Sequence, residues 1–337
     1  MEFQFQYPTY ARLVPTLQIV LNGEYKENAT VLGAVYQHLK EKKLDNLGEY
    51  LFPKKEELLN LNRAWRGSNI NATPLPDVWK DLASKQIKFR RGQVCMVAAA
   101  PNAGKSMFAL IYAVKAKVPT LFFSADTDTA TVMMRAASHL SGHSQLLVEG
   151  NLTSNRHYYD KHLDNMSNIQ FVFDSSPSLD DIELEIKAYV ELFGIPPELI
   201  VIDNLMNVVA ESDNEWAGLR AIMVDFHDMA RKTEACVMVL HHVSEQSEYG
   251  KTTFPPARRA IHGKVSQLPA LILTLGFDPL DKTLKVAPVK NRFGPHTADG
   301  SDFATLFVNY SVCQISDADE YGRMYRRDAL LSDSQVQ

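Results

Sequence analysis

The sequence contains few cysteines and no long hydrophobic run, and each absence excludes a class of protein. Its three cysteines, Cys95, Cys236 and Cys313, are far apart along 337 residues. This number and spacing fit neither a disulfide framework nor a zinc site, so we expect buried thiols in a reducing compartment. No run of about 18 apolar residues is present, and residues 1–4 do not begin a signal peptide. We therefore expect a soluble, cytoplasmic protein that does not bind membranes.

The chain also lacks an excess of positive charge. Its 35 Lys and Arg residues are outnumbered by 40 Asp and Glu residues, which gives a net charge of −5. This balance excludes a uniformly basic nucleic-acid coat protein, but it allows basic loops inside a groove or ring. Hydrophobic residues make up 45% of the chain, which is enough to bury a large core.

Two regions with different patterns divide the chain. Residues 1–75 contain short stretches with helical spacing and predict a small helical N-terminal module. From residue 76 to 337, continuous apolar runs alternate with helical patterns, which indicates an α/β domain with a mainly parallel sheet covered on both faces. Short turns join the last runs, so we expect antiparallel strands at one edge.

The expected strands cover 93–99, 119–124, 169–173, 199–202, 236–240, 271–275, 284–289 and 303–308. The expected helices follow Lys105, include 132–137, and cover 179–193 and 216–231.

The most informative stretch lies between the first expected strand and the first expected helix. Residues 99–106 read Ala-Ala-Pro-Asn-Ala-Gly-Lys-Ser, which has the spacing of a phosphate-binding loop. In such a loop, backbone N–H groups and the positive end of the following helix surround a triphosphate. We expect Lys105 to contact the phosphates and Ser106 to bind Mg²⁺. The residues expected to bind ATP are Pro101, Asn102, Ala103, Gly104, Lys105, Ser106 and Met107.

This loop lacks one glycine of the G-x-x-x-x-G-K-[ST] pattern. Ala99 occupies the first glycine position, so the backbone there must take a conformation that an L-residue tolerates. Gly-Lys-Ser alone is common; the strand before it and the helix after it make the pattern specific.

Two carboxylates that end expected strands are candidates for metal binding and catalysis. Asp203 follows the apolar run 199–202, which is the Walker B pattern, and can hold Mg²⁺ opposite Ser106. The alternative for Asp203 is a cap of a turn or helix. Asp126 follows the strand 119–124 and is the candidate that orients the attacking water. Asp128 is its rival, although the N-cap of the next helix is the simpler interpretation.

Two adjacent histidines end the strand 236–240. Adjacent residues on a strand point to opposite faces, so we do not expect these two to share a metal ion. His242 is the candidate sensor of the γ-phosphate, and His241 is the candidate for a buried side chain.

Five basic residues lie in two polar segments. Lys251, Arg258 and Arg259 belong to the long segment 245–260 and fit contacts to the phosphate backbone of single-stranded nucleic acid. A solvated surface loop is the alternative. Lys290 and Arg292 end a strand before a Gly-Pro turn. In a ring of identical subunits they can reach the γ-phosphate held by a neighbour, whereas alone they form a surface basic cluster.

These motifs, in this order and spacing, resemble the RecA-like P-loop core of DnaB-like replicative helicases and phage primase-helicases. The resemblance covers about residues 76 to 300. Within it, Asp126 stands where the family has a catalytic Glu, His242 where it has Gln or His, and Lys290 and Arg292 where it has trans-acting cations. The resemblance implies a hexameric ring that hydrolyses ATP and translocates on single-stranded DNA. It also implies a replication protein in the cytoplasm of a phage-infected bacterium.

Two other functions stay open on the sequence alone. One is a RecA-core recombination factor or structure-specific nuclease that acts on forked or flap DNA and uses ATP for assembly or regulation. A nuclease needs clustered carboxylates, and Asp174, Asp180, Asp181 and Glu183 are acidic neighbours, although a loop and a helix N-terminus explain them more simply. The other is an inactive or regulatory ATP binder, because Ala99 departs from the loop pattern and Asp126 is one methylene shorter than Glu.

Overall fold

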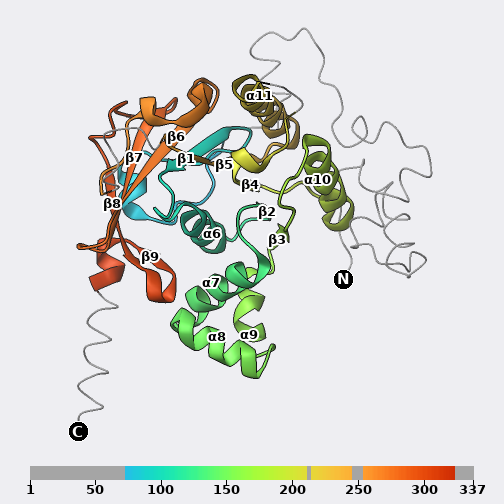
Figure 1. Cartoon of the computed structure of the whole chain (residues 1–337), viewed down its shortest axis with the longest axis vertical. Helices are drawn as coiled ribbons and strands as arrows, with labels where there is room; N and C mark the ends of the chain where they lie inside the picture. Colours follow the sequence, from blue (N-terminus) through green and yellow to red (C-terminus); the bar gives the residue numbers. More distant parts are fainter. Residues whose placement is uncertain (1–72, 211–213, 245–252, 323–337) are drawn as a thin grey trace, which may run out of the picture.

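The computed structural model describes residues 73–210, 214–244 and 253–322, so the N-terminal module expected for residues 1–75 lies almost entirely outside them. The described residues form one nine-stranded sheet, with strands in the order β3-β2-β4-β5-β1-β6-β7-β8-β9. Helices cover both faces of this sheet, and α7, α8 and α9 gather at one end of the molecule (Figure 1).

Six parallel strands form the centre of the sheet, and three antiparallel strands extend it. β3, β2, β4, β5, β1 and β6 are parallel, and β7, β8 and β9 follow with antiparallel pairing. This arrangement confirms the predicted parallel sheet with antiparallel additions at one edge. The ends of the eight predicted strands are shifted by at most three residues, and β9 was not predicted. The strands are β1 Val94–Ala99, β2 Thr120–Ser124, β3 Ile169–Val172, β4 Leu199–Asp203, β5 Cys236–His242, β6 Leu271–Asp278, β7 Thr283–Asn291, β8 Ala304–Asn309 and β9 Gln314–Ser316.

The helices connect these strands and include three α-helices that the sequence analysis did not predict, α5, α8 and α9. The α-helices are α5 Lys80–Ser84, α6 Lys105–Ala116, α7 Thr129–Ser141, α8 Gln145–Ser154, α9 Asp160–Leu163, α10 Leu179–Phe193 and α11 Glu215–Thr233. The 3-10 helices are η2 Asp164–Met166, η3 Leu205–Asn207, η4 Arg258–Ala260, η5 His262–Gln267 and η6 Tyr310–Val312. No helix in the described ranges is long and apolar enough to cross a membrane.

Residues of the central strands face two separate cores, which explains why these strands are apolar throughout. In β1, Cys95 and Val97 face the core that includes α6, whereas Val94 and Met96 face the core that includes α10 and α11. A strand buried on both faces cannot alternate polar with apolar residues, because each polar side chain would lose its water. This double burial fixes β1 rigidly, and with it the loop that follows Ala99.

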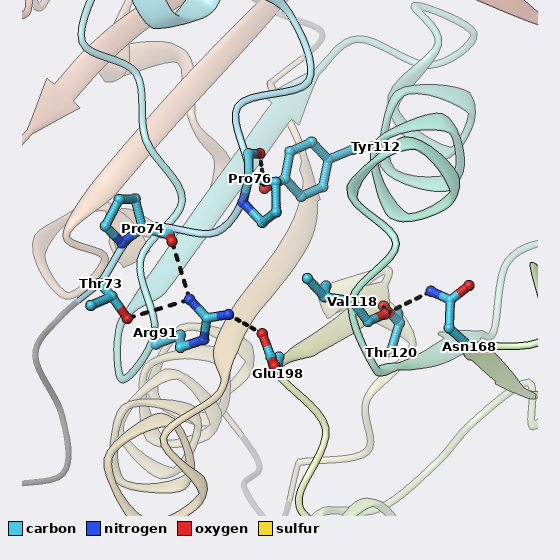
Figure 2. A network of polar contacts seen from close by, with 9 residues as sticks. All are labelled: Thr73, Pro74, Pro76, Arg91, Tyr112, Val118, Thr120, Asn168 and Glu198. Atoms are coloured by element: carbon cyan, nitrogen blue, oxygen red, sulfur yellow. Dashed lines mark hydrogen bonds and ion pairs between the residues drawn. The ribbon is translucent and has the colours of Figure 1, made fainter.

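Polar contacts tie together the amino-terminal ends of the central strands (Figure 2). Arg91, just before β1, donates from Nη1 to Thr73 Oγ1 at 3.3 Å and to the Pro74 carbonyl at 3.1 Å, and pairs through Nη2 with Glu198 just before β4. This network lies at the ends of the strands opposite to those that carry the loop 99–106. Figure 2 also shows the bonds from Tyr112 to the Pro76 carbonyl and from Asn168 to the Val118 carbonyl.

Candidate nucleotide-binding site

The loop between β1 and α6 has the backbone conformation of a phosphate-binding loop. Ala99 is still part of β1, where it pairs with His242 and Leu275 of the neighbouring strands. An L-residue therefore fits at the first glycine position of the pattern. The left-handed conformations occur later in the loop, at Asn102 with φ 60° and at Gly104 with φ 87°, and they turn the chain into α6.

Lys105 lies at the centre of the site and is buried. Its Nζ is 3.3 Å from the carbonyl oxygens of Ala99 and Ala100 and 3.5 Å from His242 Nδ1. Burial lowers the pKa of Lys105, and the negative charges of Asp203 and Asp126 oppose this shift. Lys105 is thus close to both carboxylates that the sequence analysis selected. Among the described residues, its ammonium group has hydrogen-bond contacts only with the Ala99 and Ala100 carbonyls and with His242.

Asp203 ends β4 in a position that suits a metal ligand. The residue is 2% exposed, lines a small cavity together with Ser106, and has one carboxylate oxygen, Oδ1, without a partner in the described part of the chain. Burial raises the pKa of Asp203 to about 6. A buried carboxylate with an unpartnered oxygen beside a serine hydroxyl fits Mg²⁺, which prefers hard oxygen ligands. The backbone N–H groups of Ala125 and Asp126 donate to the Asp203 carbonyl at 2.8 and 3.2 Å and fix the ends of β2 and β4 together.

Asp126 and Asp128 have different surroundings. Asp126 is exposed at the end of β2, near Lys105 and Asp203. Asp128 is the N-cap of α7 and accepts from the Thr131 backbone N–H at 3.0 Å and from its hydroxyl at 2.7 Å. Since Asp128 already serves the helix, Asp126 is the carboxylate that stays available at this edge.

The two histidines of β5 point to opposite sides of the sheet, as expected. His242 faces the site, with Nε2 3.4 Å from Asn204 Nδ2. His241 is fully buried and donates from Nε2 to the His262 carbonyl at 2.8 Å. Burial lowers the pKa of His241 to about 4, so it is neutral at physiological pH. Among the described residues, no group of His, Cys, Asp and Glu side chains that could hold a metal ion includes this pair.

Lys290 and Arg292 lie at the amino-terminal ends of β1 and β6, whereas Lys105 follows the carboxyl-terminal end of β1. β7 runs antiparallel to β6, so Lys290 pairs with Ile272 and Asn291 with Leu271, next to the start of β1. The six residues of β1 span about 20 Å, so neither cation reaches the site of its own chain. Lys290 Nζ donates to the Ser266 and Gln267 carbonyls at 3.1 and 2.6 Å, and burial together with Arg292 and Arg258 lowers its pKa to about 8.

The basic residues expected to contact nucleic acid are only partly described. Arg258 is half-buried and Arg259 is exposed, both on η4, whereas Lys251 lies outside the described residues. Arg258 is also close enough to Lys290 to lower the pKa of that lysine. The segment with η4 is anchored at the end of β5, where the Ser244 backbone N–H donates to the Ala260 carbonyl at 2.7 Å.

Two residues that the sequence analysis did not select also face the site. Arg135 of α7 lines a small cavity together with Ser106 and Asp203. Its positive charge opposes the rise that burial causes in the pKa of Asp203. The Tyr310 hydroxyl is buried, has no hydrogen-bond partner in the described ranges, and would lie 2.9 Å from a Cβ atom at Gly104. No local pattern indicates Tyr310, which is more than 200 residues away in sequence. For Arg135, the one feature in the sequence that could have indicated a place near the site is its position on the helix that follows Asp126.

Among the acidic residues considered for a nuclease, Asp181 has a structural role. Asp181 forms a capping box with Ser178 at the start of α10, accepting from the Ser178 backbone N–H at 3.0 Å. Within the described ranges, no cluster of carboxylates is able to hold a metal ion. The three cysteines are buried free thiols, as predicted, but Cys95 and Cys236 meet on neighbouring strands with their Sγ atoms 3.7 Å apart.

Comparison with known proteins identifies the family and the fold. Residues 75–257, more than half of the chain, match the DnaB-like helicase C-terminal domain. The chain belongs to this family. A DnaB-like helicase domain is an ATP-hydrolysing enzyme domain, and the loop 99–106, Asp203 and β5 of this chain all lie inside the matched range.

Relatives and solved structures agree with this assignment. The Gene 65 protein of Mycobacterium phage L5 is 41% identical over 254 residues, which cover 72% of this chain and 93% of that protein. The Gene 65 protein of Mycobacterium phage D29 is 40% identical over 241 residues, covering 66% of this chain and 99% of that protein.

Two solved structures share the fold of this DnaB-like chain at low sequence identity. A DnaB-like replicative helicase, described with its interactions with primase, has a TM-score of 0.63 and 16% identity, covering 91% of this chain and 76% of that one. A second solved structure, of an isolated ATPase domain, has a TM-score of 0.59 and 16% identity, covering 83% of this chain and 98% of that one. The predicted RecA-like fold is therefore confirmed.

Proposed function

We propose that this chain is an ATP-driven translocase that moves along single-stranded DNA as a ring of six identical subunits and unwinds forked DNA. One observation carries the proposal: Lys105 and Lys290 lie at opposite ends of the strands of the same sheet. A chain with a phosphate site at one edge and cations at the other completes its site by head-to-tail contact with a second copy. Repetition of such a contact gives a closed ring when the rotation between successive copies divides a full turn, as we propose for six copies.

Within one subunit, the residues around Lys105 bind the triphosphate of ATP. The backbone from Pro101 to Met107 surrounds the phosphates, and the Lys105 ammonium leaves the carbonyls of Ala99 and Ala100 to contact them. Ser106 and Asp203 would hold Mg²⁺, and a bound Mg²⁺ would neutralise the negative charge that develops on the phosphates. Tyr310 closes the site beside Gly104.

Two further side chains of the same subunit act on the γ-phosphate. Asp126 is exposed beside this site and orients the attacking water as a general base. His242 contacts Lys105 and Asn204, so its ring is positioned to bind the γ-phosphate and to respond to its loss. Because His242 directly precedes the segment 243–260, its movement changes the position of Arg258 and Arg259, which we assign with Lys251 to the DNA backbone.

The neighbouring subunit supplies Lys290 and Arg292. Arg292 is exposed at the end of β7, and its backbone N–H donates to the Ala270 carbonyl at 2.8 Å, which fixes its root on β6. A guanidinium placed on the γ-phosphate stabilises the charge of the transition state. We further propose that residues 1–75 form a separate helical module, and that 76–337 form the ATPase domain.

ATP turnover by single and mixed variants tests the proposal. We expect Lys105→Ala and Arg292→Ala each to lower DNA-stimulated turnover by at least about a hundredfold. Lys115→Ala is the matched control on α6, because its side chain pairs with Glu320 away from the site, and it should retain turnover.

An equal mixture of Lys105→Ala and Arg292→Ala subunits is the sharper test. Random mixing places an intact Lys105 opposite an intact Arg292 at about a quarter of the contacts, so turnover should recover to roughly that fraction. If both variants fold and assemble but their mixture recovers no ATP turnover, Arg292 does not act across the subunit contact.

A further inference from the structure

Trp216, at the start of α11, is an exposed aromatic residue that the proposed mechanism does not use. Its side chain is 46% exposed, and its ring centroid lies 4.9 Å from that of His262 with 35° between the planes. α11 follows the end of β4, and η5 follows the end of β5, so both rings lie at the sheet edge that also carries the phosphate loop.

The pair is held rigidly. The His262 carbonyl accepts the 2.8 Å hydrogen bond from His241, which is itself buried in the sheet. Gly263 has φ +82°, and a Cβ atom there would lie 3.0 Å from Leu219 Cδ1 and 3.7 Å from the Trp216 ring. Glycine is therefore required for this close packing. A ring fixed in this way loses little conformational entropy when a ligand stacks on it.

Arginines lie close to this aromatic pair along the chain, and Arg220 is one helical turn after Trp216 on α11. Arg258 and Arg259 directly precede η5 on η4, and Arg259 and Arg220 are exposed. Exposed aromatic rings beside positive charges are the combination that binds single-stranded nucleic acid, because bases stack on the rings while cations contact the phosphates. An apolar protein partner would instead need a larger apolar surface without these charges.

We propose that Trp216, supported by His262, stacks on a base of single-stranded DNA. This inference rests on the proposed function, since it names the residue that receives the strand near the ATP site. Phe254 provides a contrast, because it is 59% exposed but the Lys285 ammonium lies 4.0 Å from its ring centroid. Phe254 therefore already has a partner and serves as a control.

Tryptophan fluorescence and a labelled-strand assay test the inference together. The chain has three tryptophans, of which Trp79 is buried and Trp65 lies outside the described residues. With Mg²⁺ and a slowly hydrolysed ATP analogue, oligo(dT) should quench the emission of the wild-type protein, and Trp216→Phe should abolish this quenching. Fluorescence anisotropy of labelled oligo(dT) should show about tenfold weaker binding by Trp216→Ala, near-normal binding by Trp216→Phe, and unchanged binding by Phe254→Ala.

The two assays separate this inference from the proposed function. If wild-type protein binds labelled oligo(dT) and folded Trp216→Ala binds it equally tightly, the stacking role is wrong and the proposed function stands. If Trp216 emission changes with protein concentration and not with DNA, the ring packs on a second copy and the inference is also wrong. If wild-type protein binds no single-stranded DNA in any nucleotide state, the proposed function itself fails.

Discussion

His241 and His242 are adjacent in the chain, yet their chemistry differs because the sheet separates them. His242 contacts the buried Lys105 ammonium, whereas His241 is enclosed by the opposite core and bonded to the His262 carbonyl. A protonated His241 would place an unpaired charge in that core, which is why its pKa is lowered to about 4. The same histidine thus fixes the position of η5 without contributing to phosphate binding.

The lowered pKa of His241 predicts a specific loss of stability in acid. The unfolded chain binds a proton at this residue near its ordinary pKa of 6.5, and the folded chain only near 4. The neutral His241 therefore contributes its full stability above pH 6.5, and this contribution falls as the pH drops towards 4, by about 3 kcal/mol in total.

His241→Gln isolates this effect, because glutamine keeps a donor for the His262 carbonyl and does not titrate. Urea unfolding at several pH values should show the free energy of unfolding of the wild type falling more steeply below pH 6.5 than that of the variant. Parallel curves for the two proteins would contradict the buried, neutral state of His241.

The helices begin where side chains satisfy their first backbone N–H groups. Asp128 caps α7, and Ser178 with Asp181 forms the capping box of α10. Each of these acidic residues resembles a candidate catalytic carboxylate in the sequence. The capping bonds occupy Asp128 and Asp181, whereas Asp126 has no such role and Asp203 ends a strand.

The capping box predicts a purely structural effect of Asp181. Asp181→Ala should lower the free energy of unfolding by about 1 kcal/mol, measured by urea denaturation, because the Ser178 backbone N–H loses its acceptor. Asp180→Ala is the matched control, since Asp180 lies in the same turn and is exposed, and it should have a smaller effect. Loss of a metal-dependent cleavage activity in Asp181→Ala would instead support the nuclease alternative.

At the scale of the whole molecule, the proposed function requires each subunit to contribute to two ATP sites, one through its phosphate loop and one through Arg292. The phosphate loop lies at the carboxyl-terminal ends of the central strands and Arg292 at their amino-terminal ends. An isolated subunit therefore cannot bring Arg292 to its own phosphate loop. In the proposed ring, ATP bound between subunits would contact both groups, and binding should therefore be linked to assembly.

This linkage predicts nucleotide-dependent assembly. Analytical ultracentrifugation should show a complex of six copies with Mg²⁺ and a slowly hydrolysed ATP analogue, and Arg292→Ala should need a several-fold higher protein concentration to form it. A protein that stays monomeric at micromolar concentration in every nucleotide state would contradict the ring.

The amino-acid sequence by itself determined the phosphate loop, the Walker B strand, the order of strands and helices and the antiparallel edge. These features are local: a few consecutive residues set the strand, the turn and the helix start, and burial on both faces makes the strands apolar throughout. The helices α8 and α9 escaped prediction because short, partly exposed helices have weak periodicity.

Only the tertiary structure decided which distant residues meet. It brought Tyr310 onto Gly104, His262 between His241 and Trp216, and Lys290 onto the carbonyls of η5. It also placed Arg292 about 20 Å from the site of its own chain. Such contacts depend on the order in which the strands lie side by side in the sheet and on the direction of β7. Neither property follows from the spacing of neighbouring residues in the chain.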